Sequence, residues 1–327
     1  MSDDLILQAF DLKKHFPTGA SKLLQRPTQV VQAVDGVSLS LRRGTTLAIV
    51  GESGCGKSTL ARLLARLIEP TSGSVVLNGV NISTASSKEL LKMRREIQVV
   101  FQDPYACLNP RHSIGQSIGT PIRIQKTMSR SEERHRVFEL MELVGLSHEH
   151  YNRFPHEFSG GQRQRAGIAR ALALQPKVIV ADEPVSALDV SIQAQILNLL
   201  EKLQSDLGLS YVFIAHDLSV VRHIADEVAV MYLGKIVEIG DQEAIYAHPT
   251  HPYTKALLSA VPLPDPKIER SRKRIMLEGD VPSPVNPPSG CRFRTRCWKA
   301  QDVCAQEEPV LTIRNSGQMS ACHFPES

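Results

Sequence analysis

The feature that most constrains the fold of this chain is Thr46–Leu60, TLAIVGESGCGKSTL, in which an apolar run meets a glycine-rich turn. The turn matches the pattern Gly-x-x-x-x-Gly-Lys-Ser/Thr at Gly51, Gly56, Lys57 and Ser58. Glycine gives the backbone the freedom to turn several N–H groups toward one anion at the start of a helix. The segment therefore predicts a strand, a phosphate-binding loop (P-loop) and a helix of an α/β fold.

The residues after the turn support this interpretation. In such a loop Lys57 reaches the β- and γ-phosphates of a nucleotide, and Ser58 ligates Mg²⁺. Apolar residues then recur at helical spacing, which predicts one buried helix face ending before Pro70: Leu60, Leu63, Leu64, Leu67 and Ile68. A chance glycine loop would not require this order of strand, loop and helix, so we expect a nucleotide site.

Composition limits the possible partners. The chain has 327 residues, enough for about two domains. Its net charge of +4 is too small to predict nucleic-acid binding without a clustered basic face. It begins with MSDDL, not with a basic signal-peptide start, and no apolar run approaches the roughly 20 residues that span a bilayer. We expect a cytosolic chain that reaches a membrane through its partners.

Polar residues follow several predicted strands. Asp182 and Glu183 come directly after the apolar run 178–181, and the carboxyl ends of parallel strands are where α/β proteins bind ligands. This predicts Asp182 as a Mg²⁺ ligand and Glu183 as a general base, rather than a surface turn. Gln102 ends another strand and His216 a third. These two residues either contact the Mg²⁺ shell and the γ-phosphate, respectively, or are structural.

Two further segments complete the nucleotide site. Residues 5–12 and 37–41 predict strands, and Phe16 after the first either stacks on a purine or closes the core. The segment FSGGQRQR at 158–165 opens a helix with a serine and two glycines, which predicts a second anion site. Residues 104–160 before it are predicted to be helical, and Ser186–Asp189 precedes another amphipathic helix.

Together these motifs resemble, in sequence and order, the nucleotide-binding subunit of ATP-binding-cassette (ABC) transporters over about residues 5–260. The resemblance implies an α/β P-loop NTPase fold with a RecA-like core, an antiparallel β subdomain and a helical subdomain. It also implies that two such domains pair head to tail. Each ATP then lies between the P-loop of one chain and the Ser-Gly-Gly-Gln signature of the other.

The same resemblance implies residue roles. Phe16 stacks on adenine, and the phosphates are bound by Gly51, Glu52, Ser53, Gly54, Cys55, Gly56, Lys57, Ser58 and Thr59. The opposite chain's γ-phosphate is contacted by Ser159, Gly160, Gly161 and Gln162. Mg²⁺ is held by Ser58, Gln102 and Asp182, Asp189 lies in the D-loop, and Gln102 also senses the membrane partner. The residues expected to carry hydrolysis are Glu183, His216, Lys57 and Gln102. Phe158, where many members carry leucine, is a conservative departure.

The C-terminal part of the chain indicates a particular group within this family. HPYTKALL at 251–258, a proline-rich connector and a group of cysteines resemble the C-terminal extension of dipeptide and oligopeptide importer ATPases. We therefore expect a nucleotide-binding domain at 1–262 and an extension at 263–327. Such subunits energise peptide import at the cytoplasmic face of the inner membrane. Their partners are a second related ATPase, two membrane permeases and a periplasmic peptide-binding protein.

Four cysteines are concentrated in this extension: Cys291, Cys297, Cys304 and Cys322. In a reducing cytosol such a group indicates first a metal site and then disulfides. The resemblance implies a four-iron, four-sulfur (4Fe–4S) cluster, and four thiolates also suit Zn²⁺, although the Cys-x-x-Cys pair of common zinc sites is missing. An iron–sulfur cluster, zinc and free or paired thiols all stay open.

A function of another class is a soluble ABC ATPase that acts on nucleic acid or ribosomes. The chain has a single cassette, and its basic run Arg270–Arg274 is short enough to be a solvated linker. We therefore expect no nucleic-acid partner. A metal-sensing module with a secondary ATPase is a third alternative, and it requires the metal to change the hydrolysis rate.

Overall fold

The computed structural model describes residues 4–18, 29–103, 107–262 and 274–326. They belong to two compact units: residues 1–7, 41–45 and 76–214 form the first, and residues 8–40, 46–75 and 215–327 form the second. The predicted domain boundary after residue 262 and the start of the basic run at Arg270 lie outside the described residues. Among the described residues, no helix combines the length and apolar character needed to cross a membrane.

The first unit contains a parallel sheet. β7 (Val178–Asp182) pairs in parallel with β6 (Ile97–Val100) on one side and with β8 (Ser210–Ala215) on the other. Every residue of β7 and β8 is buried, as expected for parallel strands covered on both faces. The predicted strands before Gln102, Glu183 and His216 are therefore present.

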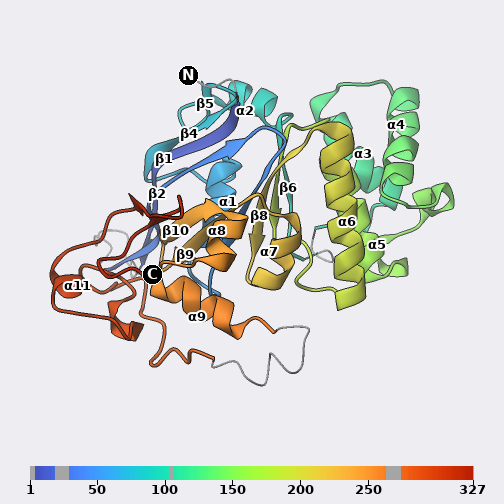
Figure 1. Cartoon of the computed structure of the whole chain (residues 1–327). Coiled ribbons are helices and arrows are strands. Elements are labelled where there is room, and N and C mark those ends of the chain that lie inside the picture. Colours follow the sequence, from blue (N-terminus) through green and yellow to red (C-terminus); the bar gives the residue numbers. More distant parts are fainter. Residues whose placement is uncertain (1–3, 19–28, 104–106, 263–273, 327) are drawn as a thin grey trace. The chain divides into compact units, whose positions relative to one another are not determined.

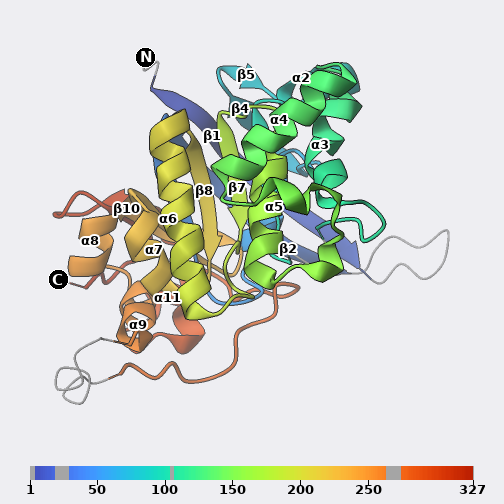
Figure 2. The ribbon, with the colours of Figure 1, turned by 90° about the vertical axis from the view of Figure 1, so that its right-hand side faces the viewer.

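Helices of the first unit pack into a group of their own. α3 (Ile114–Gln125), α4 (Arg130–Leu143) and α5 (Gly160–Leu172) contact one another (Figure 2). One apolar face of α4 is buried at Val137, Leu140 and Met141, which agrees with the helical prediction for this region. The remaining helical elements are α2 (Ser87–Met93), α6 (Val190–Leu207) and the 3-10 turns His148–Asn152 and Pro155–Glu157.

The P-loop strand lies in a sheet of the second unit that the C-terminal extension enlarges. β3 (Thr46–Val50) pairs in parallel with β9 (Glu227–Tyr232), which forms a hairpin with β10 (Lys235–Asp241). The extension adds β12 (Met319–Ser320) to β10, and β11 (Thr312–Ile313) to β12, both antiparallel. The last residues of the chain thus continue the sheet that carries the P-loop strand.

A separate four-stranded sheet has the order β2-β1-β4-β5. Its strands are β1 (Leu5–Thr18), β2 (Gln29–Arg42), β4 (Ser72–Leu77) and β5 (Val80–Asn81), with β4 and β5 antiparallel. The strands predicted at 5–12 and 37–41 are present and longer than expected.

Within the described part of the second unit, the helices are α1 (Lys57–Leu64), α7 (Leu218–Ile224), α8 (Gln242–Ala247) and α9 (Pro252–Ala260), followed by the 3-10 turn Arg294–Arg296 and α11 (Val303–Gln306) (Figure 1). The prediction that α1 continues to Ile68 is wrong. Arg66 has a left-handed φ of 51°, and the Leu67 N–H donates to the carbonyl of Arg62, so the chain turns away after Leu64.

Candidate functional site

The shape of the P-loop depends on two glycines that lie against distant backbone. A β-carbon on Gly51 would lie 2.1 Å from the carbonyl oxygen of Met231. A β-carbon on Gly56, whose φ is 108°, would lie 2.0 Å from the carbonyl oxygen of Ala33. Both distances are far below van der Waals contact, so neither position accepts a side chain.

The loop leads into a helix start that no side chain caps. Gly56 is the N-cap of α1, and it has no side chain to bond the first N–H groups. The adjacent Lys57 is buried, and its Nζ donates to the carbonyl oxygens of Gly51 at 2.7 Å and Glu52 at 3.0 Å. The loop therefore surrounds the Lys57 ammonium group, which lies next to the helix N-terminus, the positive end of the helix dipole.

Two residues of the C-terminal part hold Glu52. Its backbone N–H donates to the Tyr253 hydroxyl at 2.9 Å, and its carboxylate accepts two bonds from the Arg296 guanidinium, at 2.7 and 3.2 Å. Burial alone would lower the pKa of Arg296, but the hydrogen bonds with Glu52 raise it above its ordinary value. Sequence reasoning missed both contacts, because nothing local to Glu52 indicates a partner 244 residues away.

The aromatic residue predicted to stack on adenine lies at the surface. Phe16, near the end of β1, is 37% exposed, and the Lys14 ammonium lies 5.1 Å from its ring centroid. The alternative that Phe16 closes the core is wrong, because a core ring would be buried. An exposed ring remains available to stack on a base.

The predicted catalytic carboxylates lie in the first unit. Asp182 ends β7 and is only 6% exposed, which excludes a surface turn there. Glu183 has a left-handed φ of 47°, and its N–H donates to the carbonyl of Ile214. The Gln102 amide donates to the Glu183 carboxylate at 2.8 Å. The structure thus brings Gln102 and Glu183 into contact, and the strained backbone of Glu183 is typical of functional positions.

The predicted second anion site is the N-terminus of α5. The Ser159 hydroxyl accepts from the Gln162 N–H at 3.3 Å, and the Gln162 side-chain oxygen accepts from the Ser159 N–H at 3.0 Å. This reciprocal pair is a capping box. A β-carbon on Gly161 would lie 2.6 Å from the Ile192 side chain, so the glycine permits a close approach of two segments.

Asp189 and His216 are exposed, whereas Cys55 of the P-loop is buried and Ser58 and Thr59 are partly buried. Asp189 is the N-cap of α6 and makes no side-chain capping bond. His216 follows β8, and the next residue, Asp217, caps α7 by accepting from the Ser219 N–H at 2.7 Å. The P-loop, Phe16 and His216 belong to the second unit, while Gln102, Ser159–Gln162 and Asp182–Asp189 belong to the first.

The four cysteines of the extension line one small cavity. All four thiols are free, and burial raises the pKa of each of Cys291 and Cys297, and that of Cys322 to about 11. The donor set is one that iron–sulfur clusters and Zn²⁺ use. The cavity of about 10 Å³ has room for about one water, so a 4Fe–4S cluster would require the cavity to widen. Within the described ranges, no group of three or more His, Cys, Asp or Glu residues is arranged to hold a metal ion.

The chain is similar to known proteins over nearly its whole length. Residues 34–186 match the family described as ABC transporter, and residues 237–304 match the oligopeptide/dipeptide transporter C-terminal region. The dipeptide transport ATP-binding protein DppF of Haemophilus influenzae is 55% identical over 317 residues, which cover 97% of this chain and 96% of that protein. The oligopeptide transport ATP-binding protein OppF of Salmonella typhimurium is 55% identical over 309 residues, covering 94% and 92%.

A solved structure is similar over the cassette. The dimeric structure of a post-hydrolysis state of the ATP-binding cassette MJ0796, bound to ADP and Pi, has a TM-score of 0.65 and 30% identity. It covers 72% of this chain, and the match includes 99% of that chain.

Proposed function

Since the chain belongs to the ABC transporter family, as an ATP-binding component that energises oligopeptide or dipeptide import, we propose which of its residues bind and hydrolyse ATP. The observation that carries the proposal is the P-loop itself. An uncapped helix N-terminus and a buried lysine that donates to two loop carbonyls form a site built for an anion. The triphosphate of ATP is the anion that this family binds.

In the proposed complex the adenine stacks on the exposed ring of Phe16, and the phosphates lie against the backbone N–H groups of Gly51–Thr59. Lys57 exchanges its two carbonyl partners for phosphate oxygens, which are stronger acceptors because they are charged. Ser58, Gln102 and Asp182 supply oxygen ligands of the kind that Mg²⁺ prefers. When bound, Mg²⁺ offsets part of the phosphate charge.

For hydrolysis we assign Glu183 as the general base. It takes a proton from water while the water oxygen bonds to the γ-phosphorus and the bond to the ADP oxygen breaks. The hydrogen bond from Gln102 orients the Glu183 carboxylate. His216 contacts the γ-phosphate, and Lys57 stabilises the charge that develops on it.

The signature at Ser159, Gly160, Gly161 and Gln162 is assigned to the ATP of a second ATPase chain, with Asp189 in the D-loop of the same contact. The dimeric state of the similar MJ0796 cassette supports this assignment. Because the γ-phosphate would be shared between two chains, ATP favours the closed pair, and hydrolysis reopens it. In this proposal the movement drives two membrane permeases fed by a periplasmic peptide-binding protein, with the chain at the cytoplasmic face of the membrane.

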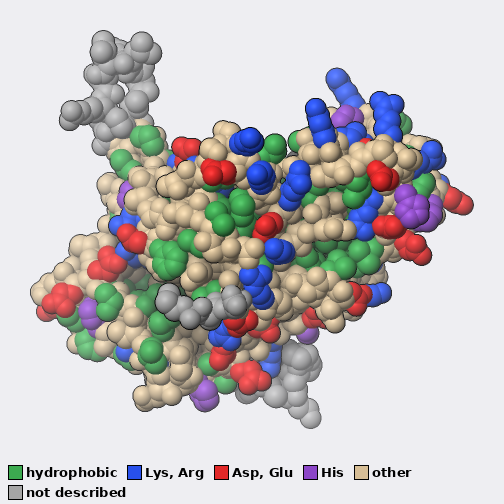
Figure 3. Space-filling view, turned by 90° about the horizontal axis from the view of Figure 1, so that it is seen from above, with side chains coloured by type: hydrophobic (Ala, Val, Ile, Leu, Met, Phe, Trp, Pro, Cys, Tyr) green, Lys and Arg blue, Asp and Glu red, His purple; other side chains and the backbone are tan. Residues whose placement is uncertain are grey.

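A nucleic-acid function has less support. Lysine and arginine side chains are interspersed with aspartate and glutamate over the face drawn in Figure 3. Phosphate backbones are bound by clustered positive charge, and mixed charge does not provide it. The relatives reported above are all transport proteins by description.

We also propose that Cys291, Cys297, Cys304 and Cys322 hold a metal, either a 4Fe–4S cluster or Zn²⁺, after the thiols rearrange, since among the described residues no such group is already placed to ligate a metal ion. Their convergence on one cavity supports the proposal, although the cavity must widen to take a cluster. Iron, acid-labile sulfide and zinc are measured on the full chain after anaerobic purification. A folded protein that contains none of them contradicts the proposal.

The test of the ATPase assignment is Glu183→Gln in the full chain. We expect ATP hydrolysis to fall by about 10²- to 10⁴-fold, the usual contribution of a general base, while ATP binding persists. Glu201→Gln, at an exposed position of α6, is the matched control and keeps the wild-type rate. Wild-type turnover by Glu183→Gln would remove Glu183 from this role.

The same variant tests the complex. Tagged Glu183→Gln protein is recovered with ATP from detergent-solubilised membranes, and its partners are identified by mass spectrometry. We expect two permeases and a second ATPase. Recovery of ribosomes or DNA-bound proteins without any membrane protein would contradict the proposed complex.

A further inference from the structure

One short segment of the C-terminal extension contacts the N-terminal part of the second unit, which carries the P-loop, at two places. The segment is Gly290–Cys297, and its residues Arg292 and Arg296 each have side chains only 8% exposed. Both arginines pair with acidic residues of the N-terminal half of the chain: Arg296 with Glu52, and Arg292 with Asp35. Arginines that are nearly buried and paired are costly to desolvate, so their positions are specific.

The first contact is with the P-loop. Arg296 holds the Glu52 carboxylate through two hydrogen bonds, and the Glu52 carbonyl oxygen accepts from Lys57 Nζ at 3.0 Å. A single residue therefore connects the extension to the lysine expected to bind phosphate. Glu52 also places a negative charge within the loop that would receive a triphosphate. Arg296 neutralises that charge, and without it the carboxylate would repel the phosphates.

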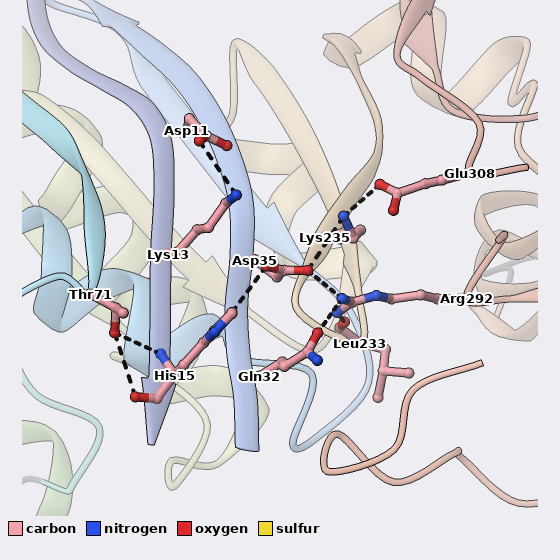
Figure 4. A network of polar contacts seen from close by, with 10 residues as sticks. All are labelled: Asp11, Lys13, His15, Gln32, Asp35, Thr71, Leu233, Lys235, Arg292 and Glu308. Carbon is pink, nitrogen blue, oxygen red and sulfur yellow. Dashed lines mark hydrogen bonds and ion pairs between the residues drawn. The ribbon is translucent and has the colours of Figure 1, made fainter. Parts of the chain in front are cut away.

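The second contact lies beside the expected adenine position. Arg292 donates to the Leu233 carbonyl at 2.6 Å and to the Gln32 side chain at 2.7 Å, and it forms an ion pair with Asp35 (Figure 4). Asp35 in turn lies 3.0 Å from His15 Nε2, and His15 precedes Phe16 in the chain. The same segment thus contacts residues near both ends of the proposed nucleotide site.

Aromatic packing holds the segment between these two contacts. Phe293 is buried, and its ring centroid lies 5.2 Å from that of Tyr232 and 5.3 Å from that of Tyr253. Tyr253 is the residue whose hydroxyl accepts the N–H of Glu52. A packed ring between two arginines limits how far either guanidinium can move.

We propose that Arg296 is a positioning residue for ATP binding: it neutralises and orients Glu52, and through Glu52 the C-terminal extension sets the affinity of the P-loop for ATP. This inference rests on the phosphate-binding role proposed above for the P-loop. Arg292 supports it by fixing the other end of the same segment. Arg296 contacts no reacting atom, so its effect falls on binding and not on the chemical step.

The test compares ATP binding and hydrolysis by the full chain and its Arg296→Ala variant, with Kd from titration of a fluorescent ATP analogue. We expect Arg296→Ala to raise Kd and KM for ATP about tenfold, equivalent to about 1.4 kcal/mol, with kcat unchanged within about twofold. Arg294→Ala is the matched control, since Arg294 lies in the same turn and donates to Ser289 of the extension. It keeps the wild-type Kd.

A second variant separates charge neutralisation from a general loss of structure. If Glu52 is harmful when unpaired, adding Glu52→Gln to Arg296→Ala restores most of the lost affinity, whereas a structural defect is not restored. Arg296→Lys keeps the charge but loses the paired geometry, and we expect an intermediate Kd. It also serves as the test if Arg296→Ala does not fold.

The possible outcomes are distinguishable. Wild-type Kd in Arg296→Ala, or no recovery in the double variant, overturns the inference and leaves the P-loop assignment intact. A wild-type chain that binds no ATP analogue overturns the P-loop assignment itself. Tenfold weaker binding with recovery by Glu52→Gln supports both.

Discussion

The N-termini of α1 and α5 are both glycine-rich, and both were predicted to bind anions, yet they are stabilised in opposite ways. α5 begins with Ser159, whose side chain and that of Gln162 bond each other's backbone N–H groups. α1 begins at Gly56 without any side-chain cap, and its loop is shaped by the backbone of Met231 and Ala33. One helix start is built from four consecutive residues, and the other depends on distant segments.

This difference matters for binding. A capped N-terminus has already satisfied part of its hydrogen-bonding capacity, so a phosphate there competes with Ser159 and Gln162. At an uncapped N-terminus no capping side chain competes with the ligand, but the loop must be held open by other parts of the protein. We infer that the P-loop is the primary phosphate site, and that the α5 terminus contributes only when a second chain brings ATP to it.

The largest effect is expected from Gly56→Ala, which disturbs the close contact between the P-loop and the distant backbone of Ala33. The added β-carbon would lie 2.0 Å from the Ala33 carbonyl oxygen in a backbone conformation that disfavours side chains. We expect ATP affinity to fall by more than about 100-fold, a loss of over about 2.7 kcal/mol. Gly208→Ala is the control, since Gly208 also has a positive φ of 64° but open space around it. Tight ATP binding by Gly56→Ala would show that the loop does not need this close approach.

The second effect concerns pH. Tyr253 of α9 bonds Glu52 of the P-loop, and the N-cap of α9 is the buried His251. His251 accepts from the Tyr253 N–H at 3.1 Å, and burial lowers its pKa to about 3, with the Arg314 charge acting in the same direction. The folded pKa lies below the unfolded value of 6.5, so the unfolded chain binds more protons between these values. The contribution of neutral His251 to the free energy of unfolding is therefore fully present above about pH 6.5. It decreases as the pH falls below that value, by up to about 1.4 kcal/mol per pH unit.

Urea unfolding of the wild type and of His251→Asn between pH 7.5 and about pH 5 measures this effect. Asparagine can still cap α9 but does not titrate in this range, so we expect the variant to lose most of the slope. An equal slope in the two proteins would assign the pH dependence to other groups. The α5 terminus contains no titratable cap, so Ser159→Ala leaves the slope unchanged.

The smallest effect is expected from Ser159→Ala, which removes the hydroxyl that caps the N-terminus of α5. Loss of a serine N-cap lowers the free energy of unfolding by about 1 kcal/mol. Ser205→Ala, at an exposed position inside α6, is the control and stays within about 0.5 kcal/mol of the wild type. Chemical denaturation gives both values. If Ser159→Ala lowered the free energy of unfolding by as many kcal/mol as Gly56→Ala lowers the free energy of ATP binding, the contrast between a local and a tertiary helix start would not hold.

Much of the site was predictable because its signals are local. The P-loop pattern, the acidic pair at the end of β7 and the Ser-Gly-Gly helix start each lie within about ten residues of sequence, and their strands and helices are present. The end of α1 was predicted wrongly. Leu67 and Ile68 continue the apolar spacing, but a left-handed Arg66 ends the helix at Leu64, and apolar spacing carries no information about that turn.

The sequence by itself determined the α/β cassette, the nucleotide it binds and the transport family, because short motifs encode backbone conformation and chemistry within a few residues. Only the tertiary structure decided that Arg296 pairs with Glu52, that Arg292 pairs with Asp35, and that four cysteines line a cavity too small for a cluster as it stands. The two ion pairs join residues more than 200 positions apart, and the cysteines come from separate turns of the extension. No periodicity or local pattern specifies them, since they depend on how separate segments pack into one unit.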